Sequence, residues 1–115
     1  MMGKKIKIRA GGVEMNATLV ESKTANALFE KLPIESKAQK WGDEIYFRIP
    51  LDLEGENLQA KVPSGAIAYW PPGNSFCIFF GQTPYSPVEV LGKVDGDEKE
   101  FAEVQDAARV RLEKV

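Results

Sequence analysis

The sequence predicts a mainly β protein, a closed antiparallel barrel of about eight short strands with two short capping helices. Two observations lead to this fold class. Seven prolines fall between positions 33 and 87, and because an interior proline breaks a helix, that stretch can hold no long helix. Short segments in which apolar and polar residues alternate recur along the chain, separated by turn residues. Closing such strands into a barrel removes exposed sheet edges.

The chain begins with the pattern of a hairpin and a helix. Residues 4–19 alternate on both sides of Gly11-Gly12, which predicts two strands and a tight turn, with the basic side chains of the first strand facing water. Ser22 or Thr24 can then cap a short helix, and Pro33 ends it.

Residues 34–41 and 44–49 flank Gly42-Asp43 and are predicted to form a second pair of strands. Because successive strand residues point to opposite faces, the second of these strands has an inner and an outer side. Ile45, Phe47 and Ile49 alternate there with Glu44, Tyr46 and Arg48. We therefore expect Tyr46 and Arg48 to share the outer face.

The centre of the predicted fold is an apolar hairpin, preceded by a polar loop. Its strands are AIAYW (66–70) and FCIFF (76–80), joined by the turn Pro71-Pro72-Gly73-Asn74. A continuous apolar run of this length is typical of a strand that is buried on both faces. We expect Cys77 to be a small buried apolar residue rather than a nucleophile.

The end of the chain repeats the strand and helix signals. Residues 88–94 are predicted to form a strand, and Asp97 with Glu100 forms a capping box for a second helix with Phe101, Val104 and Ala108 on its inner face. Residues 109–115 alternate again and are predicted to form the last strand.

The composition excludes several kinds of chemistry. The 115 residues contain no histidine and one cysteine, so histidine-dependent nucleophiles, an intramolecular disulfide, and zinc or haem sites built on histidine or several thiolates are excluded. We expect no metal and no cofactor. The net charge of −2 lacks the basic surplus that nucleic-acid binding needs.

The sequence has no signal-peptide pattern and no window of the roughly 18 apolar residues that a membrane span requires. A lone cysteine fits a reducing compartment. We therefore expect a cytoplasmic protein with no membrane partner, while the oligomeric state is left open.

Several strings along the chain resemble the cyclophilin fold. Cyclophilins place a hairpin and a capped helix before a Phe-His-Arg-Ile-Ile-Pro strand, and here SKTANALFEKLP (22–33) precedes IYFRIP (45–50). They end with a Phe-Gly-Lys-Val strand, a helix and a final strand, and here LGKV (91–94) precedes RVRLEKV (109–115).

A more specific resemblance lies in AIAYWPPGNSFCIFFGQTP (66–84), with WGDEIYF (41–47) upstream. On these strings the chain is identified as a member of a small family of cyclophilin-like proteins from archaea and thermophilic bacteria, marked by a Tyr-Trp-Pro-Pro-Gly turn and without an assigned activity. The resemblance implies that residues 1–115 form a single cyclophilin-like domain.

Arg48 matches the arginine on which prolyl isomerisation rests in cyclophilins. Such an arginine can hydrogen-bond the prolyl nitrogen and weaken the resonance of the amide bond. Other positions depart from the cyclophilin pattern. The pocket histidine falls at Val88, the pocket phenylalanine aligns with Cys77 or Phe79, and the loop that carries the pocket tryptophan is reduced to residues 82–87.

The first functional hypothesis is a protein that binds a peptide segment or a small anionic ligand in an outer-wall pocket beside Arg48. The candidate ligand-binding residues are Trp41, Tyr46, Tyr69, Trp70, Phe79 and Gln82. The alternatives are a weak peptidyl-prolyl isomerase, with Arg48 as its catalytic residue and a pocket rebuilt from Trp70, Phe79 or Tyr85, and a partner-docking module without a pocket. In the absence of a function, Arg48 would pair with Glu44 or Asp43 on the surface.

Overall fold

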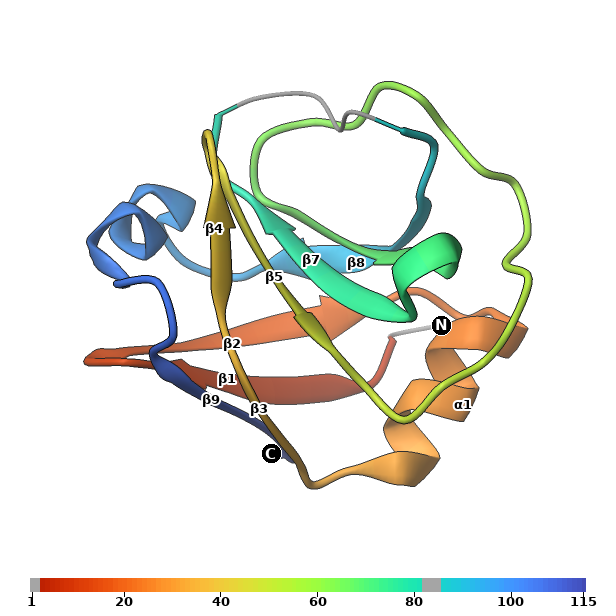
Figure 1. Cartoon of the computed structure of the whole chain (residues 1–115). Coiled ribbons are helices and arrows are strands. Elements are labelled where there is room, and N and C mark those ends of the chain that lie inside the picture. Colours follow the sequence, from red (N-terminus) through yellow and green to blue (C-terminus); the bar gives the residue numbers. More distant parts are fainter. Residues whose placement is uncertain (1–2, 82–85) are drawn as a thin grey trace.

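The computed structural model describes residues 3–81 and 86–115. These residues form one antiparallel sheet (Figure 1). In chain order its nine strands are β1 (Lys5–Ala10), β2 (Val13–Leu19), β3 (Ile34–Lys37), β4 (Gln39–Trp41), β5 (Glu44–Arg48), β6 (Ala66–Trp70), β7 (Ser75–Phe79), β8 (Glu89–Val94) and β9 (Arg109–Lys114). Their order in the sheet is β3-β9-β1-β2-β8-β6-β7-β5-β4.

The sheet curls so that its two ends meet, because β3 and β4 are consecutive in the chain. Between them Ala38 donates its N–H to the Ala108 carbonyl at 2.8 Å and accepts the Ala107 N–H at 2.7 Å. The segment predicted as one strand over 34–41 thus changes partner at Ala38, from β9 to β5. The antiparallel barrel is confirmed, with nine strands in place of the expected eight because this segment counts twice.

The first helix forms where the sequence predicts it. α1 (Lys23–Lys31) begins after Ser22, whose Oγ accepts the Ala25 N–H at 3.1 Å. Its buried face includes Ala25 and Leu28, which cover one end of the barrel. Among the described residues, no helix has the length and apolar character needed to cross a bilayer.

The second helix is shorter than expected. It is a 3-10 helix, η2 (Glu98–Glu103), capped by Asp97, whose Oδ1 accepts the Lys99 N–H at 3.0 Å. Phe101 and Val104 are buried as predicted, but Ala108 lies beyond the helix. The physical reason is that the backbone of residues 107–108 bonds to Ala38 to close the barrel, so the helix must end before it reaches them.

The interior of the barrel holds the main apolar core. Phe47 from β5 and Phe76 from β7 stack there with ring centroids 5.2 Å apart. Tyr69 from β6 also points inward and is fully buried, and its hydroxyl donates to the Leu51 carbonyl at 2.9 Å and accepts the Leu53 N–H at 3.2 Å. Tyr69 therefore fastens the long connection between β5 and β6 to the core.

A second apolar cluster lies outside the barrel, on the outer face of β6 and β7. Its buried members are Val62, Ala66, Ala68, Cys77, Phe79 and Val88. Val62 comes from the connection between β5 and β6, which is joined to the start of β8 by a two-way backbone bridge between Gln59 and Val88. With apolar packing on both faces, the whole of β7 is buried, as its unbroken apolar sequence predicts.

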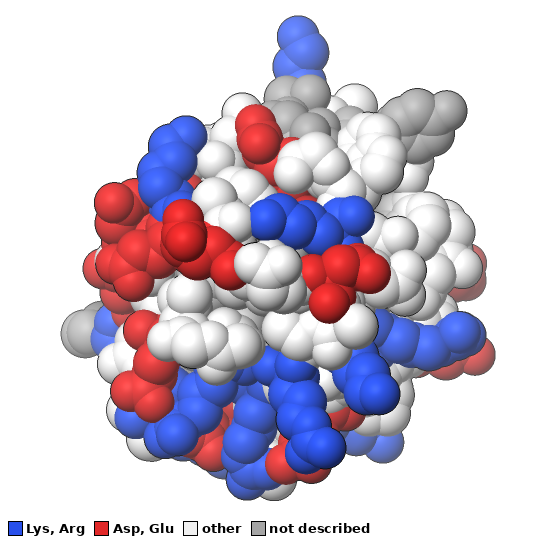
Figure 2. Space-filling view, turned by 60° about the vertical axis from the view of Figure 1, so that its left-hand side comes forward, with Lys and Arg blue, Asp and Glu red and all other residues white. Residues whose placement is uncertain are grey.

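The outer face of β1 and β9 is charged. The basic side chains predicted to face water alternate with buried Ile6 and Ile8, which confirms that expectation. Arg9 and Arg111 pair with acidic neighbours, among them Glu113. Figure 2 shows lysine and arginine interspersed with aspartate and glutamate over the visible face.

Gly92 allows β8 to pack closely against β2. Its φ of +155° is rare for other residues, and a Cβ there would lie 2.0 Å from the Thr18 carbonyl oxygen.

We expect Gly92→Ala to lower the free energy of unfolding by more than about 2 kcal/mol, measured by urea denaturation. In the control variant Gly12→Ala the new Cβ meets no atom within 4 Å, and stability should change by less than about 0.5 kcal/mol. Equal stability of the two variants would contradict the close approach.

Candidate functional site

The outer face of β5, β7 and β6 forms a grid of side chains. In antiparallel strands, directly opposed residues point to the same face of the sheet. The register therefore aligns three rows of outward-facing residues across these strands. The first row is Glu44 and Phe79, and the second is Tyr46, Cys77 and Ala68. The third row is Arg48, Ser75 and Trp70.

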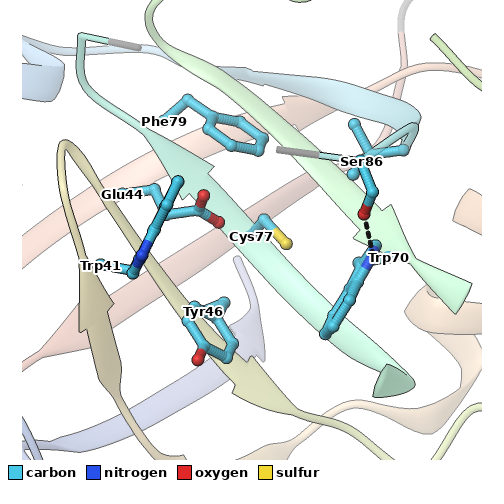
Figure 3. A pocket seen from close by; sticks show the side chains of 8 residues that line it. Trp41, Glu44, Tyr46, Trp70, Cys77, Phe79 and Ser86 are labelled. Carbon is cyan, nitrogen blue, oxygen red and sulfur yellow. Dashed lines mark hydrogen bonds between the residues drawn. The ribbon is translucent and has the colours of Figure 1, made fainter. Parts of the chain in front are cut away.

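A pocket of about 340 Å³ opens on this wall (Figure 3). Its sides are aromatic and come from four strands, namely Trp41 on β4, Tyr46 on β5, Trp70 on β6 and Phe79 on β7. The other described residues of the lining are Glu44, Cys77, Ser86 and Val88. The volume lies near the lower end of the roughly 300–1,000 Å³ typical of small-molecule sites.

The hollow exists because small residues lie between large ones. Cys77 occupies the middle of the wall, and its cross-strand neighbour on β6 is Ala68. Tyr46 faces Cys77 from β5, and Tyr46 and Trp70 meet edge to face with ring centroids 6.3 Å apart. The short side chains cannot fill the space that the surrounding rings enclose.

The ring of Trp70 is held from two sides. Its Nε1 donates to Ser86 Oγ at 2.6 Å, which joins β6 to the segment before β8. The 3-10 turn η1 (Pro71–Gly73) follows Trp70, and a Cβ at Gly73 would lie 2.3 Å from Trp70 Cζ3. Glycine at position 73 therefore allows the close approach of the indole to the turn.

Glu44 supplies a carboxylate to the pocket. Although it is acidic, the residue is only 7% exposed, and Figure 3 shows its carboxylate between Trp41 and Cys77. Burial raises the pKa of the Cys77 thiol well above its usual value, and the Glu44 carboxylate raises it further through its negative charge and by accepting a hydrogen bond from the thiol. Cys77 is buried, which confirms the prediction that it is a small buried residue.

The structure brings together four of the six predicted ligand-binding residues, Trp41, Tyr46, Trp70 and Phe79. Tyr69 is not with them, because it is adjacent to Trp70 on β6 and points into the barrel. Gln82 lies outside the described residues, as does Tyr85. Arg48 shares the outer face with Tyr46 as expected, and its row across the strands ends at Trp70, but Arg48 itself is exposed and is not part of the described lining.

Sequence reasoning did not select Glu44, Cys77, Ser86 or Val88 as ligand-binding residues. A signal for Glu44 was present, since it alternates with Tyr46 on the predicted outer face. The position of Cys77 beside Tyr46 depends on the register between β5 and β7. The positions of Ser86 and Val88 depend on the path of the chain before β8. Among the described residues, no three acidic or cysteine side chains gather into a group that could hold a metal ion.

An antiparallel barrel with few short helices is the architecture of a cyclophilin-like protein. Residues 4–113 match the family described as Cyclophilin-like. The chain therefore belongs to the cyclophilin-like family.

Among the solved structures that resemble the chain are an archaeal hypothetical protein and a protein in complex with tryptophan. The solution structure of the hypothetical protein AF2241 from Archaeoglobus fulgidus is 34% identical, with a TM-score of 0.84 over 98% of this chain and 95% of that one. The structure of McbB in complex with tryptophan is 18% identical, with a TM-score of 0.77 over 95% of this chain and 44% of that one, and it shows a shared fold alone. No curated protein matches the chain.

The contact between Cys77 and Glu44 predicts how the thiol reacts. Iodoacetamide alkylates the thiolate, so the pH dependence of the alkylation rate reports the pKa of the thiol. We expect the apparent pKa of native Cys77 to lie well above the ordinary value of about 8.5, because burial and Glu44 both raise it. Glu44→Gln removes the negative charge and should lower that apparent pKa. An unchanged or higher apparent pKa in this variant would contradict the contact.

Proposed function

We propose that this protein binds a small ligand, or one side chain of a peptide segment, through an apolar body that enters the outer-wall pocket. The observation that carries the proposal is the ring of four aromatic side chains, Trp41, Tyr46, Trp70 and Phe79, around a floor of small residues. Ligand sites in proteins are usually concave and apolar, with a few polar groups that set orientation. Glu44 and Ser86 are the polar groups of this pocket.

The exposure of Trp41 supports this proposal. The residue is 48% exposed although it carries the largest apolar side chain of any residue type, and it lies at the rim of the pocket. Burial of an aromatic side chain contributes more to binding than that of most other residues. A ligand in the pocket would cover part of this ring and gain that contribution.

Isomerase activity has less support than binding. The mechanism implied by the cyclophilin resemblance places an arginine next to the prolyl nitrogen of the substrate. Arg48 matches that arginine in sequence, yet no arginine belongs to the described lining of the pocket. A proline held among the aromatic rings would lie beside the Glu44 carboxylate, which cannot donate a hydrogen bond to the prolyl nitrogen while it is ionised.

Indole compounds are suitable probes for the pocket. The pocket volume of about 340 Å³ lies within the range of small-molecule sites, and one protein with this fold has been solved in complex with tryptophan. The two tryptophans of this chain both line the pocket. Their indole N–H signals in a ¹⁵N NMR spectrum therefore report on this site, and unlabelled indole ligands do not interfere.

Titration with indole should shift both tryptophan N–H signals and the amides of β5, β6 and β7 around the pocket, with a Kd on the order of 1 mM or below. Two variants at the floor provide the control. Cys77→Leu fills the hollow and should abolish the shifts, whereas Cys77→Ala leaves it open and should retain them. Thermal unfolding verifies that both variants are folded. No shifts in the wild type, or equal binding by both variants, would refute the proposal.

A further inference from the structure

We infer that the pocket selects an organic ammonium ion, a protonated amine carried on a small apolar or aromatic body. This inference rests on the proposed function and names the chemical class of its ligand. It differs from the sequence hypothesis of an anionic ligand, which depended on Arg48. The arginine is not part of the described lining, and the charged group within that lining is the carboxylate of Glu44.

The charge of the described lining comes from Glu44 alone. Its other members are aromatic, aliphatic, a serine and the cysteine, and the thiol keeps its proton because burial and Glu44 raise the pKa of Cys77. Lysine and arginine are absent from the described lining. The pocket is thus an apolar cavity with one negative group at its side.

The aromatic walls strengthen the preference for a cation. The faces of aromatic rings carry partial negative charge, and a cation within about 6 Å of a ring centroid gains about 0.5–2 kcal/mol from it, most with tryptophan. Two of the four rings here belong to tryptophan. The rings and the carboxylate therefore attract the same sign of charge and repel an anion.

A hydrogen bond to Glu44 further favours a cation over a neutral ligand. Each carboxylate oxygen can accept more than one hydrogen bond, so Glu44 can accept one from a ligand in addition to the one from Cys77. When the donor is an ammonium group, that hydrogen bond is charge-assisted and stronger than a neutral one.

The size of the pocket limits the body that carries the amine. A volume of about 340 Å³ accommodates one ring system or an alkyl chain rather than a folded peptide. An amine of this size has two sources, a free small molecule such as an arylalkylamine or the side chain of a lysine in a peptide. Both present the same ammonium chemistry to Glu44.

Three probes of nearly equal shape test the inference by ¹⁵N NMR titration. Tryptamine is cationic, N-acetyltryptamine is neutral and indole-3-propionate is anionic. We expect tryptamine to bind at least about tenfold more tightly than the neutral probe, a difference of about 1.4 kcal/mol, and the anion to bind least. N-acetyl-lysine methylamide tests the peptide source. Tighter binding of this probe than of tryptamine would assign the ammonium to a lysine side chain, and weaker binding would assign it to a free amine.

Glu44→Gln keeps the shape of the side chain and removes its charge, and it should reduce the preference for tryptamine over N-acetyltryptamine to less than about twofold. Glu44→Asp keeps the charge and should retain the preference. Glu35→Gln is the matched control, because it removes the same charge from an exposed site where Glu35 pairs with Arg111, and it should leave the preference unchanged.

The outcomes distinguish this inference from the proposed function. If the three indole probes bind equally well to the wild type, or the anion binds most tightly, the pocket is a ligand site but the ammonium assignment is wrong. Retention of the tenfold preference by a folded Glu44→Gln variant would also overturn the assignment. If none of the probes shifts the pocket signals, the proposed function itself fails.

Discussion

Burial of the β6–β7 hairpin on both faces is the constraint on which the rest of the structure depends. Its inner face supplies Phe76 and Tyr69 to the barrel core, and its outer face supplies Cys77 and Phe79 to the second cluster. Apolar packing on both sides holds these strands more firmly than a sheet with one wet face. The hairpin therefore forms the floor of the pocket and supplies Trp70 to its side, while β4, β5 and the segment before β8 provide the other described walls.

The local pattern of the sequence was sufficient to predict most of the fold. Alternation predicted which residues of β5 point inward, Ser22 was named as a possible cap of α1, and the apolar run over 76–80 indicated burial on both faces. The change of partner at Ala38 and the shortening of the last helix could not be predicted in this way. Both follow from hydrogen bonds between residues about 70 positions apart, and a local pattern contains no information about such pairings.

The candidate site was predictable only in part, for the same reason. Tyr46 could be placed outward from its own strand, but whether Tyr69 or Trp70 faces the pocket depends on how β6 pairs with β7. Family resemblance directs attention to Arg48, whereas the described lining of the hollow includes Cys77 and Glu44 and not Arg48. A barrel of one family can host different sites, because the site depends on a few side chains on the wall and not on the fold.

The central claim is that Glu44 and the aromatic rings around it form one site for an organic ammonium ion. A crystal structure of the protein soaked with tryptamine tests this claim most directly. The account predicts the indole between Trp41 and Trp70, with the ammonium nitrogen within hydrogen-bond distance, about 2.7–3.0 Å, of a Glu44 carboxylate oxygen. Tryptamine bound elsewhere on the barrel, or bound in the pocket with its ammonium directed away from Glu44 into solvent, would contradict it.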